Sequence, residues 1–107
     1  IRMPESLVGK GEFFALIAKG ESMVDAGIHP GDYVMIRKQN TAELGDIVVA
    51  LDQGVNNLKV LGFNHNKGAY FLRSCNEDKE RYGDIYPEEL QIQGVAVCVA
   101  HRLKKML

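Results

Sequence analysis

Glycine recurs along this chain at intervals of roughly ten residues, and this spacing is the feature that most constrains the fold. Eleven glycines divide the 107 residues into short runs that are rich in β-branched and aromatic side chains. Turn-forming residues at such intervals are typical of many short strands and leave little room for long helices. The sequence therefore predicts an all-β, or strongly β-dominated, domain.

The apolar runs between the glycines give the positions of the strands. Six strands are predicted, over residues 13–18, 33–36, 47–51, 58–63, 69–73 and 92–100. The run over 47–51 is almost continuously apolar, so we expect that strand to be covered on both faces. Single helical turns are predicted over 22–26, where Gly27 would end the turn, and over 87–90. Residues 1–11 are more polar, and we expect them to form a loosely held arm.

Length, charge and cysteine content narrow the classes of function. A chain of 107 residues suffices for one hydrophobic core, so we expect a single domain over 1–107. The formal net charge of −1 argues against a domain that binds the DNA backbone by electrostatics alone. Two cysteines are too few for a disulfide scaffold, which favours a cytoplasmic chain with reduced thiols. No apolar run approaches the roughly 18–20 residues of a membrane span, and no secretory leader is present, so no membrane contact is expected.

Ser22 lies where a predicted strand gives way to a tight turn, in the segment Gly20-Glu21-Ser22-Met23. A serine behind a glycine at a strand end can be presented together with forward-pointing backbone N–H groups, which is what an oxyanion hole requires. The same local sequence also fits an ordinary helix N-cap formed by the Ser22 hydroxyl. Local sequence leaves both interpretations open.

Lys59 lies inside the apolar run Leu58-Lys59-Val60-Leu61. Strand alternation places Lys59 on the same face as Leu61, and Leu58 on the same face as Val60. If the face with Leu61 points inward, Lys59 does so as well. The alternative is a lysine exposed on an edge strand, where it would discourage pairing with other chains.

A serine nucleophile needs a neighbouring base, and the sequence offers few candidates. The three histidines, His29, His65 and His101, fall in turns or near the end of the chain, where we expect them to be exposed. A lysine can act as the base only when it is neutral. That requires an apolar setting that lowers its pKa from about 10.4. Lys59 among leucine and valine side chains fits this requirement.

The remaining polar candidates have simpler structural explanations. Asp32 and Asp46 each follow a glycine, so turn hydrogen bonds are favoured over an acid or metal-binding role. Met23 fits either a substrate pocket or the core. Cys98 fits a buried small hydrophobe, and Cys75 fits a free thiol in a polar loop. No cluster has the spacing of metal ligands and no phosphate-binding loop is present, so neither a metal nor a cofactor is expected.

Four blocks of the sequence, taken in order, resemble the LexA-type self-cleaving repressors. Residues 20–34 resemble the block around the nucleophile of that family, and 45–50 resemble the strand that follows it. Residues 58–61 resemble the lysine block, and 92–99 resemble the closing strand. Each block is weak alone, but their order and the separation of Ser22 from Lys59 agree with the family over nearly the whole chain.

The resemblance implies a C-terminal catalytic domain made of several strongly twisted small sheets, a fold shared with signal peptidases. By this resemblance Ser22 is the nucleophile, Lys59 is the general base, and the backbone N–H groups of Glu21 and Ser22 form the oxyanion hole. The family cleaves an Ala–Gly bond on an upstream loop of its own chain. RecA filaments on single-stranded DNA stimulate this cleavage, which lifts repression of the SOS genes. An N-terminal helix-turn-helix domain binds operator DNA as a dimer.

The chain departs from the family pattern because neither the helix-turn-helix nor the upstream Ala–Gly site is present in it. Its one Ala–Gly pair, Ala26-Gly27, lies inside the nucleophile block and is better explained as part of a turn. We therefore expect an isolated peptidase and dimerisation domain, with a homodimer formed through the edge of the strand Ile92 to Ala100. The alternatives are a dimerisation module with a silent dyad, from a phage-type repressor or a related mutagenesis protein, and a membrane-bound signal peptidase, whose anchor is absent here.

Overall fold

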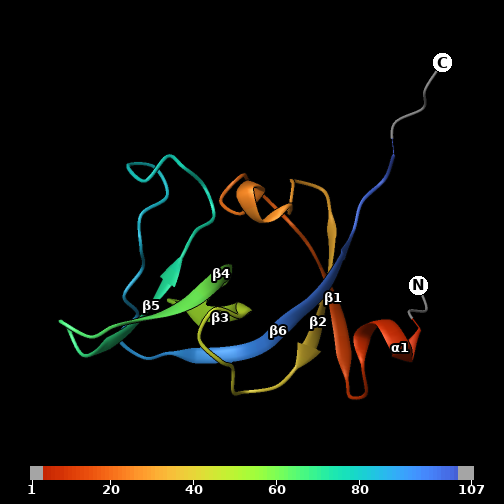
Figure 1. Ribbon diagram of the computed structural model, residues 1–107, viewed down its shortest axis with the longest axis horizontal. Coiled ribbons are helices and arrows are strands. Elements are labelled where there is room, and N and C mark those ends of the chain that lie inside the picture. Colours follow the sequence, from red (N-terminus) through yellow and green to blue (C-terminus); the bar gives the residue numbers. More distant parts are fainter. Residues whose placement is uncertain (1–3, 104–107) are drawn as a thin grey trace.

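The computed structural model describes residues 4–103, in which six strands form one continuous antiparallel sheet (Figure 1). The strands are β1 (Phe13–Ile17), β2 (Tyr33–Lys38), β3 (Ile47–Asp52), β4 (Val55–Asn64), β5 (Ala69–Arg73) and β6 (Gln91–Ala100). Their order across the sheet is β1-β2-β6-β3-β4-β5. Helical structure is confined, within residues 4–103, to α1 (Glu5–Val8) and a 3-10 turn, η1 (Val24–Ala26). The all-β prediction is confirmed, and the strands expected in several small sheets are hydrogen-bonded into one.

The hairpin between β3 and β4 shows why the strand positions could be predicted from turn residues. Asp52 pairs with Val55, and the two residues between them, Gln53 and Gly54, have φ angles of 49° and 78°. Positive φ at both positions is typical of the two-residue turns that match the twist of antiparallel strands. Because the turn is this tight, β4 begins at Val55 rather than at the predicted residue 58.

The closing strand β6 lies in the middle of the sheet and joins its two halves (Figure 1). Residues Gly94 to Ala100 pair with β2, and Gln91 to Val95 pair with β3. The register shifts on both sides of β6, between Met35 and Ile36 and between Val49 and Ala50. Such irregularities increase local twist, so the β1–β2 half turns away from the β3–β4–β5 half.

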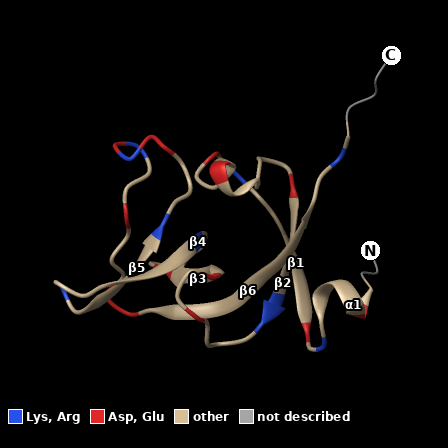
Figure 2. Cartoon of the chain, in the orientation of Figure 1, with Lys and Arg blue, Asp and Glu red and all other residues tan. Residues whose placement is uncertain are grey.

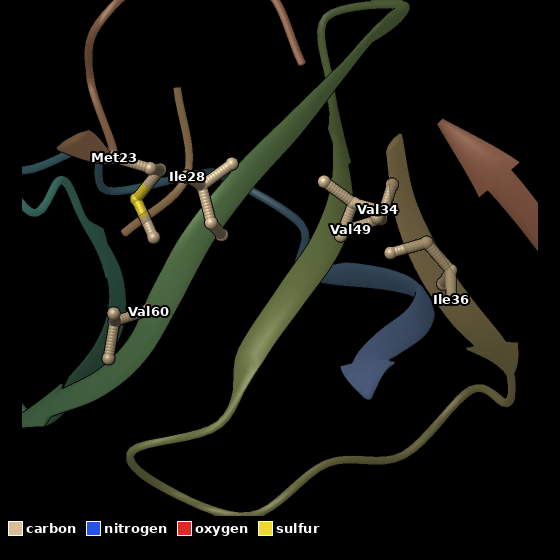
Figure 3. Packing of buried hydrophobic residues seen from close by; sticks show 6 residues of the cluster. All are labelled: Met23, Ile28, Val34, Ile36, Val49 and Val60. Carbon is tan, nitrogen blue, oxygen red and sulfur yellow. The ribbon is translucent and has the colours of Figure 1, made fainter. Parts of the chain in front are cut away.

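Two hydrophobic clusters form the core on opposite faces of β3. Figure 3 shows six buried residues of the first cluster, namely Met23, Ile28, Val34, Ile36, Val49 and Val60. The second cluster contains Val48, Ala50, Leu61 and Leu72. Consecutive residues of β3 alternate between the two clusters, as the pleat of a strand requires. The prediction that this strand is covered on both faces is confirmed.

The helical predictions were only partly correct. Of the turn predicted over 22–26, only residues 24–26 are helical, and they end at Gly27, whose φ is +81°, as the sequence indicated. No helical turn forms over 87–90, where the chain only bends. The expected loose arm is wrong from residue 4 onward, since α1 packs with Val8 only 5% exposed. The Arg37 guanidinium holds α1 in place by donating from Nη2 to the Val8 carbonyl at 2.6 Å.

Residues of both charge signs occur at strand ends and in the connecting loops (Figure 2). The loop after β5, for example, carries Asp78, Lys79, Glu80 and Arg81 in succession.

No helix within residues 4–103 has the length and hydropathy needed to cross a bilayer.

Candidate active site

The structure brings Ser22 and Lys59 together. Ser22 lies in the turn between β1 and η1, while Lys59 lies on β4, where it pairs with Val48 of β3. Lys59 Nζ donates a hydrogen bond to Ser22 Oγ at 3.1 Å and a longer one to the Leu58 carbonyl at 3.4 Å. These two side chains are 37 residues apart in the sequence, so their contact is entirely a product of the tertiary fold.

Lys59 is buried, with 9% of its surface exposed. The alternative of a solvent-facing lysine on an edge strand is therefore wrong. Loss of hydration on burial disfavours the charged amine and lowers the pKa of Lys59 below its usual value. The turn that carries Ser22 helps to exclude water, since Met23 beside it is only 4% exposed and packs in the first core cluster.

The turn around Ser22 leaves two backbone N–H groups without a hydrogen-bond partner in the described part of the chain. Ser22 does not cap η1, because Met23 occupies the N-cap position and makes no side-chain capping bond, so the N-cap interpretation is wrong. Gly20 has a φ of +70°, which allows the chain to turn sharply as it leaves β1. Within residues 4–103 no acceptor bonds the backbone N–H of Glu21 or Ser22. Both donors therefore remain available to a bound oxygen.

A pocket of about 320 Å³ opens beside the two side chains. It is lined from two sides, by the end of β1 with the following turn and by the start of β4. Its lining residues are Leu16, Ile17, Ala18, Lys19, Gly20, Ser22, Met23, Ile28, Asn56, Asn57, Leu58 and Lys59. Met23 thus belongs to both the pocket and the core, so the two predictions made for it are compatible.

The other polar candidates lie elsewhere and form turns. Asp32 Oδ2 accepts the His29 backbone N–H at 2.8 Å, and Asp46 Oδ2 accepts the Glu43 N–H at 2.9 Å. Both are the turn hydrogen bonds that the Gly-Asp sequences predicted. The three histidines are exposed. Within the described part of the chain, no three His, Cys, Asp or Glu side chains cluster closely enough to hold a metal ion.

The two cysteines are free thiols, and each is half-buried. Cys98 is therefore less buried than predicted. Cys75 lies in the loop after β5 but packs against the first core cluster, so its environment is less polar than its sequence neighbours indicated. Its neighbour Asn76 was not identified from the sequence at all, although its side chain donates a hydrogen bond to the Glu21 carbonyl beside Ser22.

The edge expected along Ile92 to Ala100 is only partly available. Gly94 and Val95 pair with both β2 and β3, so this stretch has no free edge. Within residues 4–103, the strand from Ala96 to Ala100 pairs with β2 alone and its other edge is open. The prediction of one long continuous edge is wrong because β6 became a central strand.

Comparison with known proteins gives a consistent result over nearly the whole chain. Residues 1–97 match the family model described as Peptidase S24-like. The chain is 43% identical over 97 residues to the LexA repressor of Leifsonia xyli subsp. xyli, and this match covers 91% of this chain and 41% of that protein. It is 40% identical over 103 residues to the LexA repressor of Acidothermus cellulolyticus, and this match covers 96% of this chain and 36% of that protein.

A third relative, the LexA repressor of Desulforamulus reducens, is 36% identical over 103 residues, covering 96% of this chain and 46% of that protein. The chain thus spans less than half the length of each of these relatives. The resemblance to LexA-type repressors that the ordered sequence blocks indicated is confirmed.

Proposed function

The chain belongs to the Peptidase S24-like family, and from this membership we propose that it hydrolyses a peptide bond with Ser22 as nucleophile and Lys59 as general base. The observation that carries the proposal is the 3.1 Å contact between Ser22 Oγ and the Nζ of a buried lysine. A serine hydroxyl is a weak nucleophile unless a base within hydrogen-bond reach accepts its proton. The lowered pKa of Lys59 increases the fraction of neutral amine that can do so.

In the first step the neutral Lys59 amine accepts the Ser22 hydroxyl proton while Oγ attacks the carbonyl carbon of the scissile bond. The carbonyl oxygen becomes an oxyanion, which the N–H groups of Glu21 and Ser22 stabilise by hydrogen bonds. The Lys59 ammonium then gives its proton to the leaving nitrogen as the C–N bond breaks, which leaves an ester on Ser22. In the second half, Lys59 accepts a proton from a water molecule that attacks this ester, and the Ser22 hydroxyl is restored.

The proposed substrate is an Ala–Gly bond in an upstream segment of the same polypeptide. The Ala26-Gly27 pair is a poor candidate for the scissile bond because it forms the end of η1, where Gly27 has a left-handed conformation. The relatives are LexA repressors, so we extend the proposal to a cytoplasmic repressor of the SOS response. Operator DNA would be bound by a separate N-terminal domain, and RecA filaments on single-stranded DNA would stimulate the cleavage.

The test is cleavage in trans of a synthetic peptide that contains an Ala–Gly bond and the flanking sequence of a LexA cleavage loop. At mildly alkaline pH we expect the wild-type chain to cut this bond, with the fragments identified by mass spectrometry. Ser22→Ala and Lys59→Ala should each lower kcat/KM by roughly 10⁴-fold or more, since the two groups act as a unit. The exposed residues Ser6 and Lys38 supply matched controls, and Ser6→Ala and Lys38→Ala should cleave normally. Cleavage that survives both site substitutions would contradict the dyad.

A second candidate function is a dimerisation module that need not cleave, and a specific surface favours it. Ile17 and Tyr33 face each other across β1 and β2, and they are 56% and 39% exposed. They lie at the same end of the sheet as the open part of β6, since Tyr33 pairs with Ala100, and Val99 there is 37% exposed. We propose that two copies pair through this end of β6. Sedimentation should show a dimer that Val99→Lys weakens, whereas a monomer at high protein concentration would refute the pairing.

A further inference from the structure

The loop that follows β5 contacts the nucleophile turn at two points, one on each side of Ser22. Asn76 Nδ2 donates to the Glu21 carbonyl at 2.8 Å. The Asp25 backbone N–H donates to the Cys75 carbonyl at 2.9 Å. Figure 1 shows the two segments near each other, after β5 and around η1, although 55 residues separate Glu21 from Asn76 in the sequence. The turn is therefore held from outside as well as by its own hydrogen bonds.

The hydrogen bond from Asn76 fixes the orientation of the Ser22 N–H as well as that of the Glu21 carbonyl. The Glu21 carbonyl and the Ser22 N–H belong to one planar peptide unit, which is trans, so the two groups point in opposite directions. Fixing the direction of the carbonyl therefore fixes the direction of the Ser22 N–H. Within the turn itself the Glu21 carbonyl accepts only a longer bond, from the Val24 N–H at 3.3 Å. The shorter bond from Asn76 is the stronger constraint on this peptide unit.

The Asn76 side chain is itself held in place. Its Oδ1 accepts the Asp78 backbone N–H at 2.9 Å, which closes a local turn and directs Nδ2 toward Glu21. The amide thus joins two loops with its two ends. Its donor reaches the turn of the nucleophile, and its acceptor organises the loop from which it comes.

We propose that Asn76 is a positioning residue that aims the Ser22 N–H at the oxyanion of the reacting peptide bond. This inference rests on the proposed Ser22–Lys59 peptidase function and adds a residue to it. An oxyanion donor is effective only when it is already aimed at the place where charge develops, so a peptide unit free to rotate would lose much of its effect. Asn76 touches neither the substrate nor Lys59, and it acts through the Glu21 peptide unit.

The variant that isolates this bond is Asn76→Asp. Aspartate keeps the volume and the Oδ1 acceptor for Asp78, but it loses the donor to Glu21 and places a carboxylate oxygen against that carbonyl. We expect kcat for the Ala–Gly peptide to fall about 10- to 100-fold, less than for complete removal of an oxyanion donor. KM should not change, because the pocket is unaltered, and the pH midpoint of kcat should not change in the uncharged variant Asn76→Ala, because the burial of Lys59 is unaltered. Asn76→Ala should slow the reaction to at least a similar extent.

Asn64 provides a matched control because its side chain makes the same kinds of bond far from the site. Its Oδ1 accepts the backbone N–H groups of Asn66 and Lys67, and its Nδ2 donates to Tyr86 Oη at 2.9 Å. Asn64→Asp should leave kcat unchanged. A comparable loss of kcat in Asn64→Asp would show that any loosening of a loop slows the reaction, and the inference would fail.

The outcomes separate this inference from the proposed function. If Asn76→Asp cleaves with the wild-type kcat, or if KM shifts with it, or if the pH midpoint of kcat shifts in Asn76→Ala, the positioning role is refuted while the dyad stands. If the wild-type chain does not cleave, the peptidase proposal fails, and the positioning is judged by NMR. The Glu21 carbonyl ¹³C and Ser22 amide ¹⁵N resonances should then shift in Asn76→Asp but not in Asn64→Asp. Unchanged resonances would refute the inference whatever the activity.

Discussion

Replacing Lys59 by methionine should make the folded chain more stable at neutral pH while removing the proposed base. The Lys59 side chain is buried, and within residues 4–103 its Nζ bonds only Ser22 Oγ and the Leu58 carbonyl, at 3.1 and 3.4 Å. An ammonium group has three N–H donors. A protonated Lys59 would therefore keep at least one donor without a protein acceptor in a buried position, and this loss of hydration lowers its pKa.

The pH dependence of this effect has a definite sign. Because the pKa of Lys59 is lowered by folding, the unfolded chain binds more protons than the folded one, and the free energy of unfolding rises with pH. For one proton the slope is at most about 1.36 kcal/mol per pH unit. The cost of burying the charge is complete below the folded pKa and disappears above the unfolded value of about 10.4. Methionine does not titrate, so its advantage should be largest at neutral pH and should shrink toward pH 10.4.

The size of the gain follows from the contacts that change. Methionine has nearly the length of the lysine stem, so it fills the same space without leaving a cavity. Loss of the hydrogen bond to Ser22 costs about 0.5–1.5 kcal/mol. Replacement of buried ionic groups by apolar side chains of similar size often stabilises proteins by about 1–4 kcal/mol. We expect a net gain of about 1–2 kcal/mol at pH 7, and each kcal/mol raises Tm by roughly 4–8 °C in a domain near this size.

Urea unfolding followed by circular dichroism between pH 6.5 and 9.5 measures the difference directly, since the chain has no tryptophan for fluorescence. Lys38→Met is the matched control, because Lys38 also lies on a strand but its side chain is 67% exposed. That substitution should change stability by less than about 0.5 kcal/mol at every pH. If Lys59→Met is instead less stable than wild type at pH 7, with a difference that does not vary with pH, the buried amine is not the destabilising group inferred here.

Three further outcomes follow from the same structure. Peptide cleavage should rise with pH through the lowered pKa of Lys59 and level off below pH 10.4, because only the neutral amine accepts a proton, and a rate still rising beyond that pH would contradict it. Gly94→Ala should lower the free energy of unfolding in urea by about 1–3 kcal/mol, since a Cβ there would lie 2.5 Å from the Arg37 carbonyl oxygen. Asp32→Ala should cost about 1–3 kcal/mol by leaving the His29 N–H without its acceptor, yet leave kcat unchanged, whereas a lost kcat in a folded variant would revive a catalytic role.

Strand positions could be predicted because they depend on local patterns. The run over 47–51 is apolar at consecutive positions, and β3 is covered on both faces as that pattern indicated. The turn at Gln53-Gly54 forms because both residues adopt positive φ, which glycine in particular allows. The helical turn predicted over 87–90 does not form, because a helix of one turn gains too little from its own hydrogen bonds without support from packing.

The strand that was predicted to form the dimer edge shows a feature of the fold that local sequence patterns do not determine. A long apolar strand near the end of the chain looked like a free edge, but whether a strand is central or peripheral depends on which other strands pair with it. Val95 is paired on both sides, whereas Ala100 is paired only with Tyr33. No pattern within the strand distinguishes these two positions.

The sequence alone predicted the short strands and the glycine-supported turns, and it indicated Ser22 and Lys59 as the candidate nucleophile and base. Periodicity and turn preferences act over a few residues, which is why they could be read directly. Whether the Lys59 amine was exposed or buried, and hence in which direction its pKa moved, was decided only when a turn 37 residues away packed against it. The hydrogen bond from Asn76 to the Glu21 carbonyl was likewise decided by the tertiary structure, because desolvation and long-range hydrogen bonds exist only once distant segments are packed together.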